Sequence, residues 1–204
     1  MKIAILKRLR LAIAVIFGVV GVFIGTTAIV MAQTQNTQIS SVISPVVSVF
    51  TTNGTVNVNV TPTGTGAQTI ASDTVTISTN DTNGYTLQLA ESSATTTMDY
   101  STYTIPASTG TQTTPTVMSV NTWGYRVDGL GGFGAGPTSP ASSTAISGTI
   151  KFAGVPASGS PNTLVTAPGT ATNATTTVWY GVAANTSQAS GTYTNTVTYT
   201  VTTG

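Results

Sequence analysis

The stretch DTVTISTNDTNGYTLQLA, residues 73–90, decides the fold of this chain. Apolar residues alternate with polar ones on both sides of the segment NDTNG at residues 80–84. An alternation with a period of two is typical of a strand that is buried on one face. A short segment rich in Asn, Asp and Gly between two such runs is typical of a hairpin turn. The sequence therefore predicts an antiparallel hairpin over residues 73–90.

The same pattern recurs along most of the chain. Further strands are predicted at residues 56–60, after the turn signal Asn53-Gly54, and at residues 118–127, 149–152, 176–184 and 192–202, with one short strand around Tyr100, Tyr103 and Ile105. Helical periodicity does not occur after Ala32. Short strands separated by turn residues predict an all-β fold. We expect an antiparallel β-sandwich, Ig-like or jelly-roll-like, over residues 53–204, preceded by one N-terminal hydrophobic helix.

The composition argues against most enzyme classes. The chain has no cysteine and no histidine, and only 5% of its residues are charged, against about a quarter in an ordinary domain. The thiol nucleophile, the commonest general base and the commonest metal ligand are therefore missing. We expect no catalytic residue, no cofactor and no metal site. After residue 32, two basic residues face five acidic ones, a net charge of −3, so no basic patch for nucleic acid is expected.

The N-terminus carries an export signal. Four basic residues precede an apolar run over residues 11–32, interrupted only by Thr26 and Thr27: Lys2, Lys7, Arg8 and Arg10. A cleavage pattern of small residues ends at Ala32, which predicts a signal peptide over residues 1–32. The run is also about as long as a membrane-spanning helix, so an uncleaved signal anchor is the alternative. In either case we expect an extracellular or cell-surface protein that contacts the membrane only through residues 11–32.

Residues 33–52 are predicted to form an N-terminal extension. Within it, VISPVVSV at residues 42–49 is apolar and β-branched, with Pro45 at its centre. Proline confines such a segment to a sheet edge. The segment could add as a donor strand to the sheet of a neighbouring copy, with five candidate assembly residues: Val42, Ile43, Val46, Val47 and Val49. Alternatively, it pairs as the first strand of its own domain.

Aromatic residues suggest a second kind of site. Trp123, Tyr125 and Phe133 lie in or beside a glycine-rich loop at residues 129–140 and could form a platform for a sugar ring; packing in the core is the alternative. Trp179 and Tyr180 point to opposite faces of one strand, so at most one is expected in the core. Residues 79–90 lack the bidentate acid of a calcium loop and predict a turn instead.

A single lysine follows the apolar N-terminal run. A buried lysine beside an asparagine and a carboxylate could form an intramolecular isopeptide link, as in some Gram-positive pilins. Lys151 is the one candidate, and the sequence offers no visible partner for it. We therefore do not expect an isopeptide link at Lys151.

The C-terminal residues carry a family resemblance. The segment QASGTYT at residues 188–194, followed by NTVTYTVT, resembles the closing hairpin of several secreted bacterial β-sandwich families. These are WxL-type cell-wall-associated proteins, spore-coat-U-type pilin-like proteins and camelysin-type matrix fibre proteins. The resemblance implies a secreted surface or matrix protein.

These observations support two functional hypotheses. The first is a non-enzymatic, secreted or cell-surface structural protein, a coat or fibre subunit whose partner is another copy of itself. The second is an adhesion module that binds carbohydrate, either of the cell wall or of a host.

Overall fold

The computed structural model describes residues 37–204. Residues 43–204 belong to one folded unit, and residues 37–42 precede it as exposed chain outside any strand. The hydrophobic helix and the signal segment predicted over residues 1–32 lie outside the described residues. Among the residues that are described, there is no helix that could cross a membrane.

The described part of the chain is all-β, and every ladder between its named strands is antiparallel. The strands are β1 (Val47–Thr51), β2 (Ala67–Thr79), β3 (Tyr85–Glu91), β4 (Met98–Tyr100), β5 (Tyr103–Ile105), β6 (Thr116–Val117), β7 (Thr122–Val127), β8 (Ala141–Ser143), β9 (Lys151–Phe152), β10 (Asn162–Ala167), β11 (Ala171–Ala184) and β12 (Val197–Thr203).

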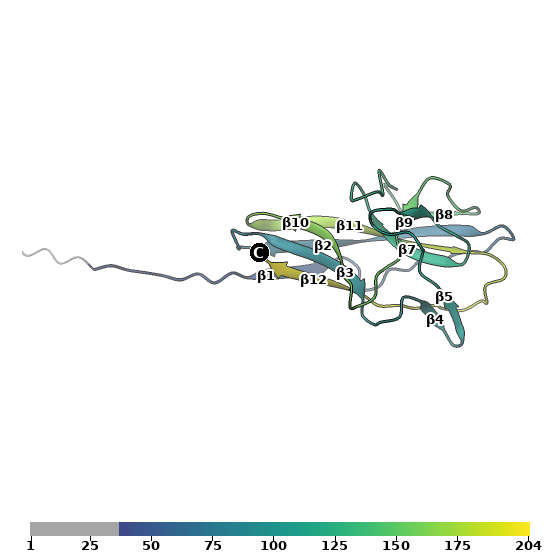
Figure 1. Cartoon of the computed structure of the whole chain (residues 1–204), viewed down its shortest axis with the longest axis horizontal. Helices are drawn as coiled ribbons and strands as arrows, with labels where there is room; N and C mark the ends of the chain where they lie inside the picture. Colours follow the sequence, from purple (N-terminus) through teal and green to yellow (C-terminus); the bar gives the residue numbers. More distant parts are fainter. Residues whose placement is uncertain (1–36) are drawn as a thin grey trace, which may run out of the picture. The chain divides into compact units, whose positions relative to one another are not determined.

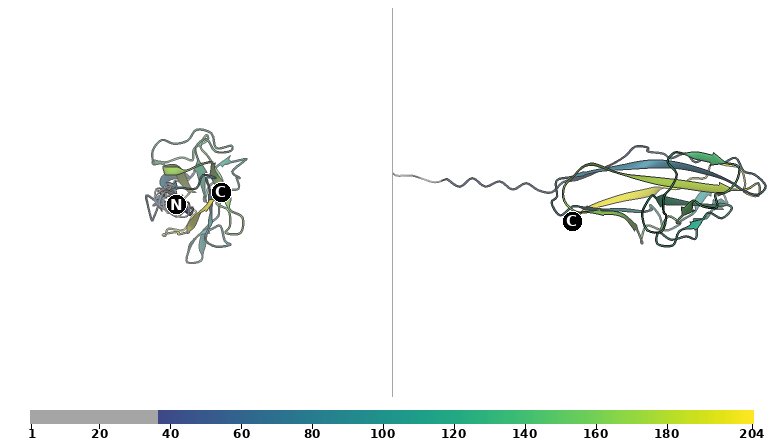
Figure 2. Two further views of the ribbon diagram at one scale, coloured as in Figure 1. Left: turned by 90° about the vertical axis from the view of Figure 1, so that its left-hand side faces the viewer. Right: turned by 90° about the horizontal axis from the view of Figure 1, so that it is seen from above.

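The larger sheet is built on two long strands. β2 and β11 pair from Thr79↔Ala171 to Ala67↔Ala184, with one irregularity between Ala171 and Ala174. They run side by side through the folded unit (Figure 2). The strand order is β1-β2-β11-β7, and β8 pairs with the beginning of β2. Because β1 pairs with the end of β2, β1 and β8 follow one another along the same edge.

The second sheet has the order β10-β3-β12, and Figure 1 places it beside the larger sheet. Two short pairs, β4-β5 and β6-β9, complete the fold. Ala153, which follows β9, bridges to Tyr125 of β7. The small β6-β9 pair therefore continues the larger sheet beyond its β7 edge.

The predicted hairpin over residues 73–90 is wrong in its pairing. Both strands form where the alternation places them, but β2 belongs to the larger sheet and β3 to the smaller one. The NDTNG segment therefore crosses between sheets, turning through Asp81, which is buried, and Gly84, whose φ is +96°. Alternation fixes which face of a strand is buried, not which strand lies beside it.

Other strand predictions need similar corrections. β11 and β12 form near the strands predicted at residues 176–184 and 192–202, but they lie in different sheets and do not form the closing hairpin that the resemblance implies. Residues 56–60 form no ladder, although Val56, Val58 and Val60 pack against the core as their alternation predicts. The short strand predicted around Tyr100 is a pair of strands, β4 and β5.

Side chains from both sheets share one core. Val75, Ile77 and Val178 of the larger sheet and Leu87 and Leu89 of the smaller one are completely buried in the same cluster. The hydroxyl groups of Tyr180 and Tyr199 meet at 2.8 Å and join β11 to β12. This shared core holds the two sheets against each other.

One end of the larger sheet, where β2 begins and β11 ends, is buried on its second face as well. Trp179 packs there with Ile70, Met118, Phe152 and Ala183, while Tyr180 packs in the main core. Both aromatic side chains of this pair are therefore buried, and the prediction that at most one would be in the core is wrong. The sequence gives no sign of the second cluster, because short irregular segments supply its cover.

Candidate functional site

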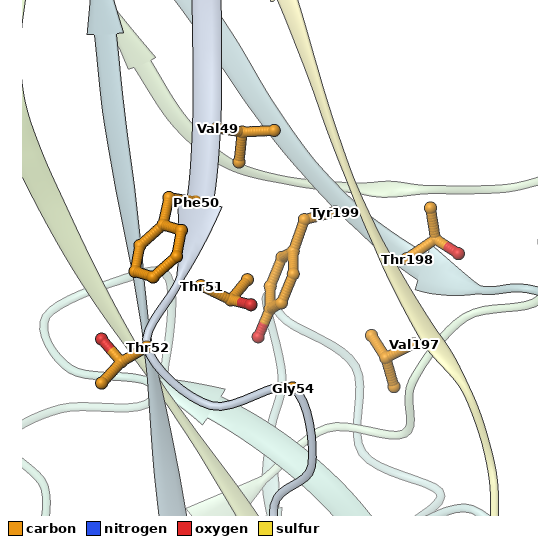
Figure 3. Close-up of a pocket in the computed structure, with 8 residues that line it drawn as sticks. All are labelled: Val49, Phe50, Thr51, Thr52, Gly54, Val197, Thr198 and Tyr199. Carbon is orange, nitrogen blue, oxygen red and sulfur yellow. The ribbon is translucent and has the colours of Figure 1, made fainter.

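An open groove of about 690 Å³ lies between β1 and β12. It is lined by Val49, Phe50, Thr51, Thr52, Gly54, Val197, Thr198 and Tyr199, shown in Figure 3. None of these residues carries a charge. Val49 is 44% exposed and Phe50 is 67% exposed. The groove is therefore an uncharged, partly apolar surface rather than a polar reaction site.

Two free strand edges flank this groove. β1 pairs with β2 and β12 pairs with β3, and within residues 37–204 neither strand has a ladder partner on its other side. A free edge presents unpaired N–H and C=O groups to any extended chain that reaches it. The site can therefore accept a further strand, and its side chains can cover apolar groups at the same time.

Tyr199 is the one titratable residue among those that line the groove, and its hydroxyl is bonded to that of the buried Tyr180. Burial raises the pKa of both Tyr180 and Tyr199 above the ordinary tyrosine value, and the two hydroxyls bond to each other. Both phenols remain protonated at neutral pH and act as a structural link between the sheets.

The candidate assembly residues divide into two groups. Val47 and Val49 belong to β1, which pairs with β2 of the same chain from Val47↔Thr79 to Thr51↔Val75. Val42, Ile43 and Val46 lie before β1 and are 93%, 82% and 64% exposed. Val47 and Val49 therefore belong to a strand of their own domain, which is the alternative that the sequence left open. The side chains of Val42, Ile43 and Val46 are not covered by any other described residue.

Ile39 extends the exposed group and was missed by the sequence analysis. Its side chain is 91% exposed. Residues 33–41 read as polar because serine, glutamine and threonine surround this single isoleucine. Its spacing of four from Ile43 was the signal that could have identified it, since residues four apart lie on the same side of an extended chain.

Asn80 fixes the chain just before β1. Its side-chain oxygen accepts a hydrogen bond from the Val46 N–H at 2.7 Å, and its amide donates to the Ser44 carbonyl at 3.1 Å. The hydroxyl of Thr79 donates to the Val46 carbonyl at 2.9 Å. These contacts anchor residues 44–46 to the end of β2.

The aromatic residues predicted as a sugar platform are buried. Trp123, Tyr125 and Phe133 are 4%, 0% and 3% exposed and belong to the main core. The Trp123 Nε1–H donates to the Thr96 carbonyl at 3.0 Å, and the Tyr125 hydroxyl donates to Gln112 at 2.8 Å. Their polar groups are thus used inside the protein, and they offer no ring face to a ligand in this structure.

Arg126 anchors the glycine-rich loop beside them. This completely buried side chain forms an ion pair with Asp128 at 3.1 Å. It also donates hydrogen bonds to the carbonyl groups of Phe133 and Gly134, at 3.2 and 3.1 Å, and to that of Lys151 at 3.3 Å. The Lys151 residue itself is exposed, so the buried lysine that an isopeptide link requires does not occur at this position.

Glu91 is the unusual acid of the fold. It is 1% exposed at the end of β3, and neither carboxyl oxygen has a hydrogen-bond partner within bonding geometry in the described part of the chain. Burial raises the pKa of Glu91 to about 8, an effect that the Asn195 amide opposes and Asp99 reinforces. The Asn195 amide also donates to the Thr97 carbonyl at 2.6 Å.

The other acids do not gather into a site. Within residues 37–204 there is no group of three or more Asp, Glu, His or Cys that could hold a metal ion. Asp81, in the segment compared with a calcium loop, instead accepts a hydrogen bond from the Asn83 N–H at 2.9 Å. This is a side-chain turn that supports the crossing between sheets.

A pair of exposed tyrosines was also missed. Tyr100 and Tyr103 face each other across the β4-β5 hairpin and are 40% and 52% exposed. The Tyr100 ring packs against Tyr193 with centroids 5.6 Å apart. The sequence analysis assigned these tyrosines to an ordinary strand, because alternation alone does not distinguish a projecting hairpin from a strand of the main sheets.

Comparison with known proteins gives no relative. No family model, no curated protein and no solved structure matches the chain.

Proposed function

We propose that this chain is a non-enzymatic structural protein of the cell surface, exported through its N-terminal segment and assembled with copies of itself into a coat or fibre. The observation that carries the proposal is the exposed apolar segment before β1. Ile39, Val42, Ile43 and Val46 are between 64% and 93% exposed. In this proposal the two sheets form a β-sandwich of Ig-like or jelly-roll-like type.

The energetics of that segment favour assembly. Full burial of one aliphatic side chain is worth about 1.5–3 kcal/mol, so four clustered side chains represent a substantial driving force. Apolar side chains that are exposed together in one short segment are typical of interaction sites. Covering this segment in an assembly removes the cost of its exposure.

The surface chemistry supports a structural role over catalysis. Among the described residues, Glu91 is the buried acid with a raised pKa, and its side chain is 1% exposed. The groove between β1 and β12 contains hydroxyl and apolar groups but no charged side chain. A surface of this kind suits contacts between neutral protein subunits.

The proposal is tested on protein recovered from the native cell surface without heating. We expect mass spectrometry to find a chain that begins at Gln33, or the intact chain in the membrane fraction. We expect gel filtration to find large species that dissociate on heating. Recovery from the cytosol would contradict the proposed export, and a monomer at every concentration would contradict the proposed assembly.

The second candidate function is carbohydrate binding, and the exposed pair Tyr100 and Tyr103 favours it. Aromatic rings with one wet face are suited to stacking on sugars. If the hairpin binds glycan, Tyr103→Ala should weaken binding of cell-wall fragments in calorimetry, while Phe50→Ala, which removes another exposed ring, should not. Equal binding by both variants and the wild type would contradict this role for the hairpin.

A further inference from the structure

We propose that the groove between β1 and β12 is the acceptor site for residues 39–46 of a second copy of this chain. The inference rests on the proposed self-assembly and specifies its two surfaces. The incoming segment pairs through its backbone with the free edge of β12 and covers the groove with its apolar side chains.

The first argument is the match of the two surfaces. Residues 39–46 contain only Ile, Val, Ser and Pro, and the residues that line the groove are likewise uncharged. β1 and β12 also contact each other within the chain, so the incoming segment pairs with β12 where Val197, Thr198 and Tyr199 line the groove. A period of two places Ile39 and Ile43 on one face of the segment, and that face is the one that covers Val49 and Tyr199.

The second argument is that a chain cannot readily fill its own groove. The contacts of Asn80 and Thr79 hold residues 44–46 against the end of β2. Pro45 fixes its own φ and restricts Ser44 to extended conformations. The segment would have to reverse within these few residues to reach β12 of its own chain. A second copy meets no such restriction.

The third argument concerns the free backbone edges. An apolar strand edge without a partner is a liability that proteins normally blunt with charges, proline or a cover. β12 carries no charged residue along Val197–Thr203, and its outward side chains are exposed threonines, Thr198, Thr200 and Thr202. Pairing with a second copy satisfies this edge and covers Ile39 and Ile43 in one step.

The proposal is tested by disulfide cross-linking between introduced cysteines. Because the chain has no cysteine of its own, only the introduced pair can form a disulfide. Val42→Cys is combined in the full chain with Thr198→Cys, Thr200→Cys or Thr202→Cys, so that three possible registers are sampled. Each protein is mildly oxidised, and denaturing gels are run without reductant. The matched control combines Val42→Cys with Thr163→Cys on β10, since Thr163 and Thr200 oppose the same residue, Gln88, from opposite edges of the sheet.

We expect at least one of the three pairs to give a ladder of disulfide-linked multimers, with the control at least tenfold weaker. A cross-linked monomer would overturn the proposal, because the segment would then occupy its own groove. If light scattering finds multimers but the gels show no ladder, or the control gives an equal ladder, the proposed acceptor site is wrong while self-assembly itself is supported. If light scattering finds only a monomer, both the acceptor site and the proposed self-assembly are wrong.

Discussion

At the scale of single residues, Glu91 connects stability to pH. Its folded pKa of about 8 lies above the ordinary value of 4.5, so the folded state binds the proton more tightly than the unfolded state. The resulting stabilisation is complete below pH 4.5 and is lost as the pH rises through 8.

We therefore expect Glu91→Gln to remove this pH dependence. The glutamine keeps the shape of the neutral acid, so the variant should exceed the wild type in free energy of unfolding at pH 8 by roughly 2–4 kcal/mol, with a smaller difference at pH 5. Urea unfolding at both pH values measures the effect. Parallel pH profiles for the two proteins would contradict the burial of an unpaired carboxyl group.

Arg126 is the second residue with a large expected effect. Lysine keeps its charge but cannot bond to Asp128 and three carbonyl groups at once. Arg126→Lys should lower the free energy of unfolding by about 2–3 kcal/mol and increase proteolysis in residues 129–140. The matched control is Lys151→Met at an exposed cation, where we expect a change within about 0.5 kcal/mol. Similar losses in both variants would show that buried bonding is not the cause.

At the scale of elements, the crossing between β2 and β3 depends on Gly84. Its φ of +96° disfavours any other residue, and an added Cβ would overlap the Ala167 carbonyl. Gly84→Ala should therefore cost at least about 2 kcal/mol of unfolding free energy. Gly54→Ala, with nothing within 4 Å of the added Cβ, should change it by less than about 1 kcal/mol. Thermal unfolding compares the two, and a tolerant Gly84 would contradict the turn geometry.

Four of the main strands could be located from the sequence, but their partners could not. Alternation marked β2, β3, β11 and β12, yet the two strands of the hairpin predicted over residues 73–90 belong to different sheets, and so do β11 and β12. A short polar connection can either return along the same sheet or cross about 10 Å to the next. The choice depends on packing between residues far apart in the chain, such as Tyr180 with Tyr199.

The candidate site was predicted in part. The apolar character of residues 42–49 is visible in the sequence, while the division at Val46 arises from the contacts of Asn80, 34 residues away. The groove itself is formed by β1 and β12, which lie near opposite ends of the described chain. No local pattern could bring these two edges together. Trp123 and Tyr125 follow the alternative of packing in the core, and their hydrogen-bond partners Thr96 and Gln112 lie 27 and 13 residues away.

At the scale of the whole molecule, the scarcity of charge has a consequence for assembly. No charged residue lies in residues 37–46 or lines the groove, so screening by salt has little to act on. At fixed concentration, light scattering should find the weight-average mass unchanged within about twofold between roughly 50 and 500 mM sodium chloride. Dissociation at high salt would indicate an interface that uses the few charged residues instead.

The central claim is that exposed residues 39–46 drive self-assembly, and Ile43→Asp tests it most directly. Ile43 is 82% exposed, so a charge there should leave the unfolding temperature unchanged while it disrupts an apolar contact between copies. The measurement is the molar mass by light scattering over a concentration series of wild type and variant. The account predicts a mass that grows with concentration for the wild type and a monomer for Ile43→Asp. Equal growth in both, or a monomeric wild type throughout, would contradict it.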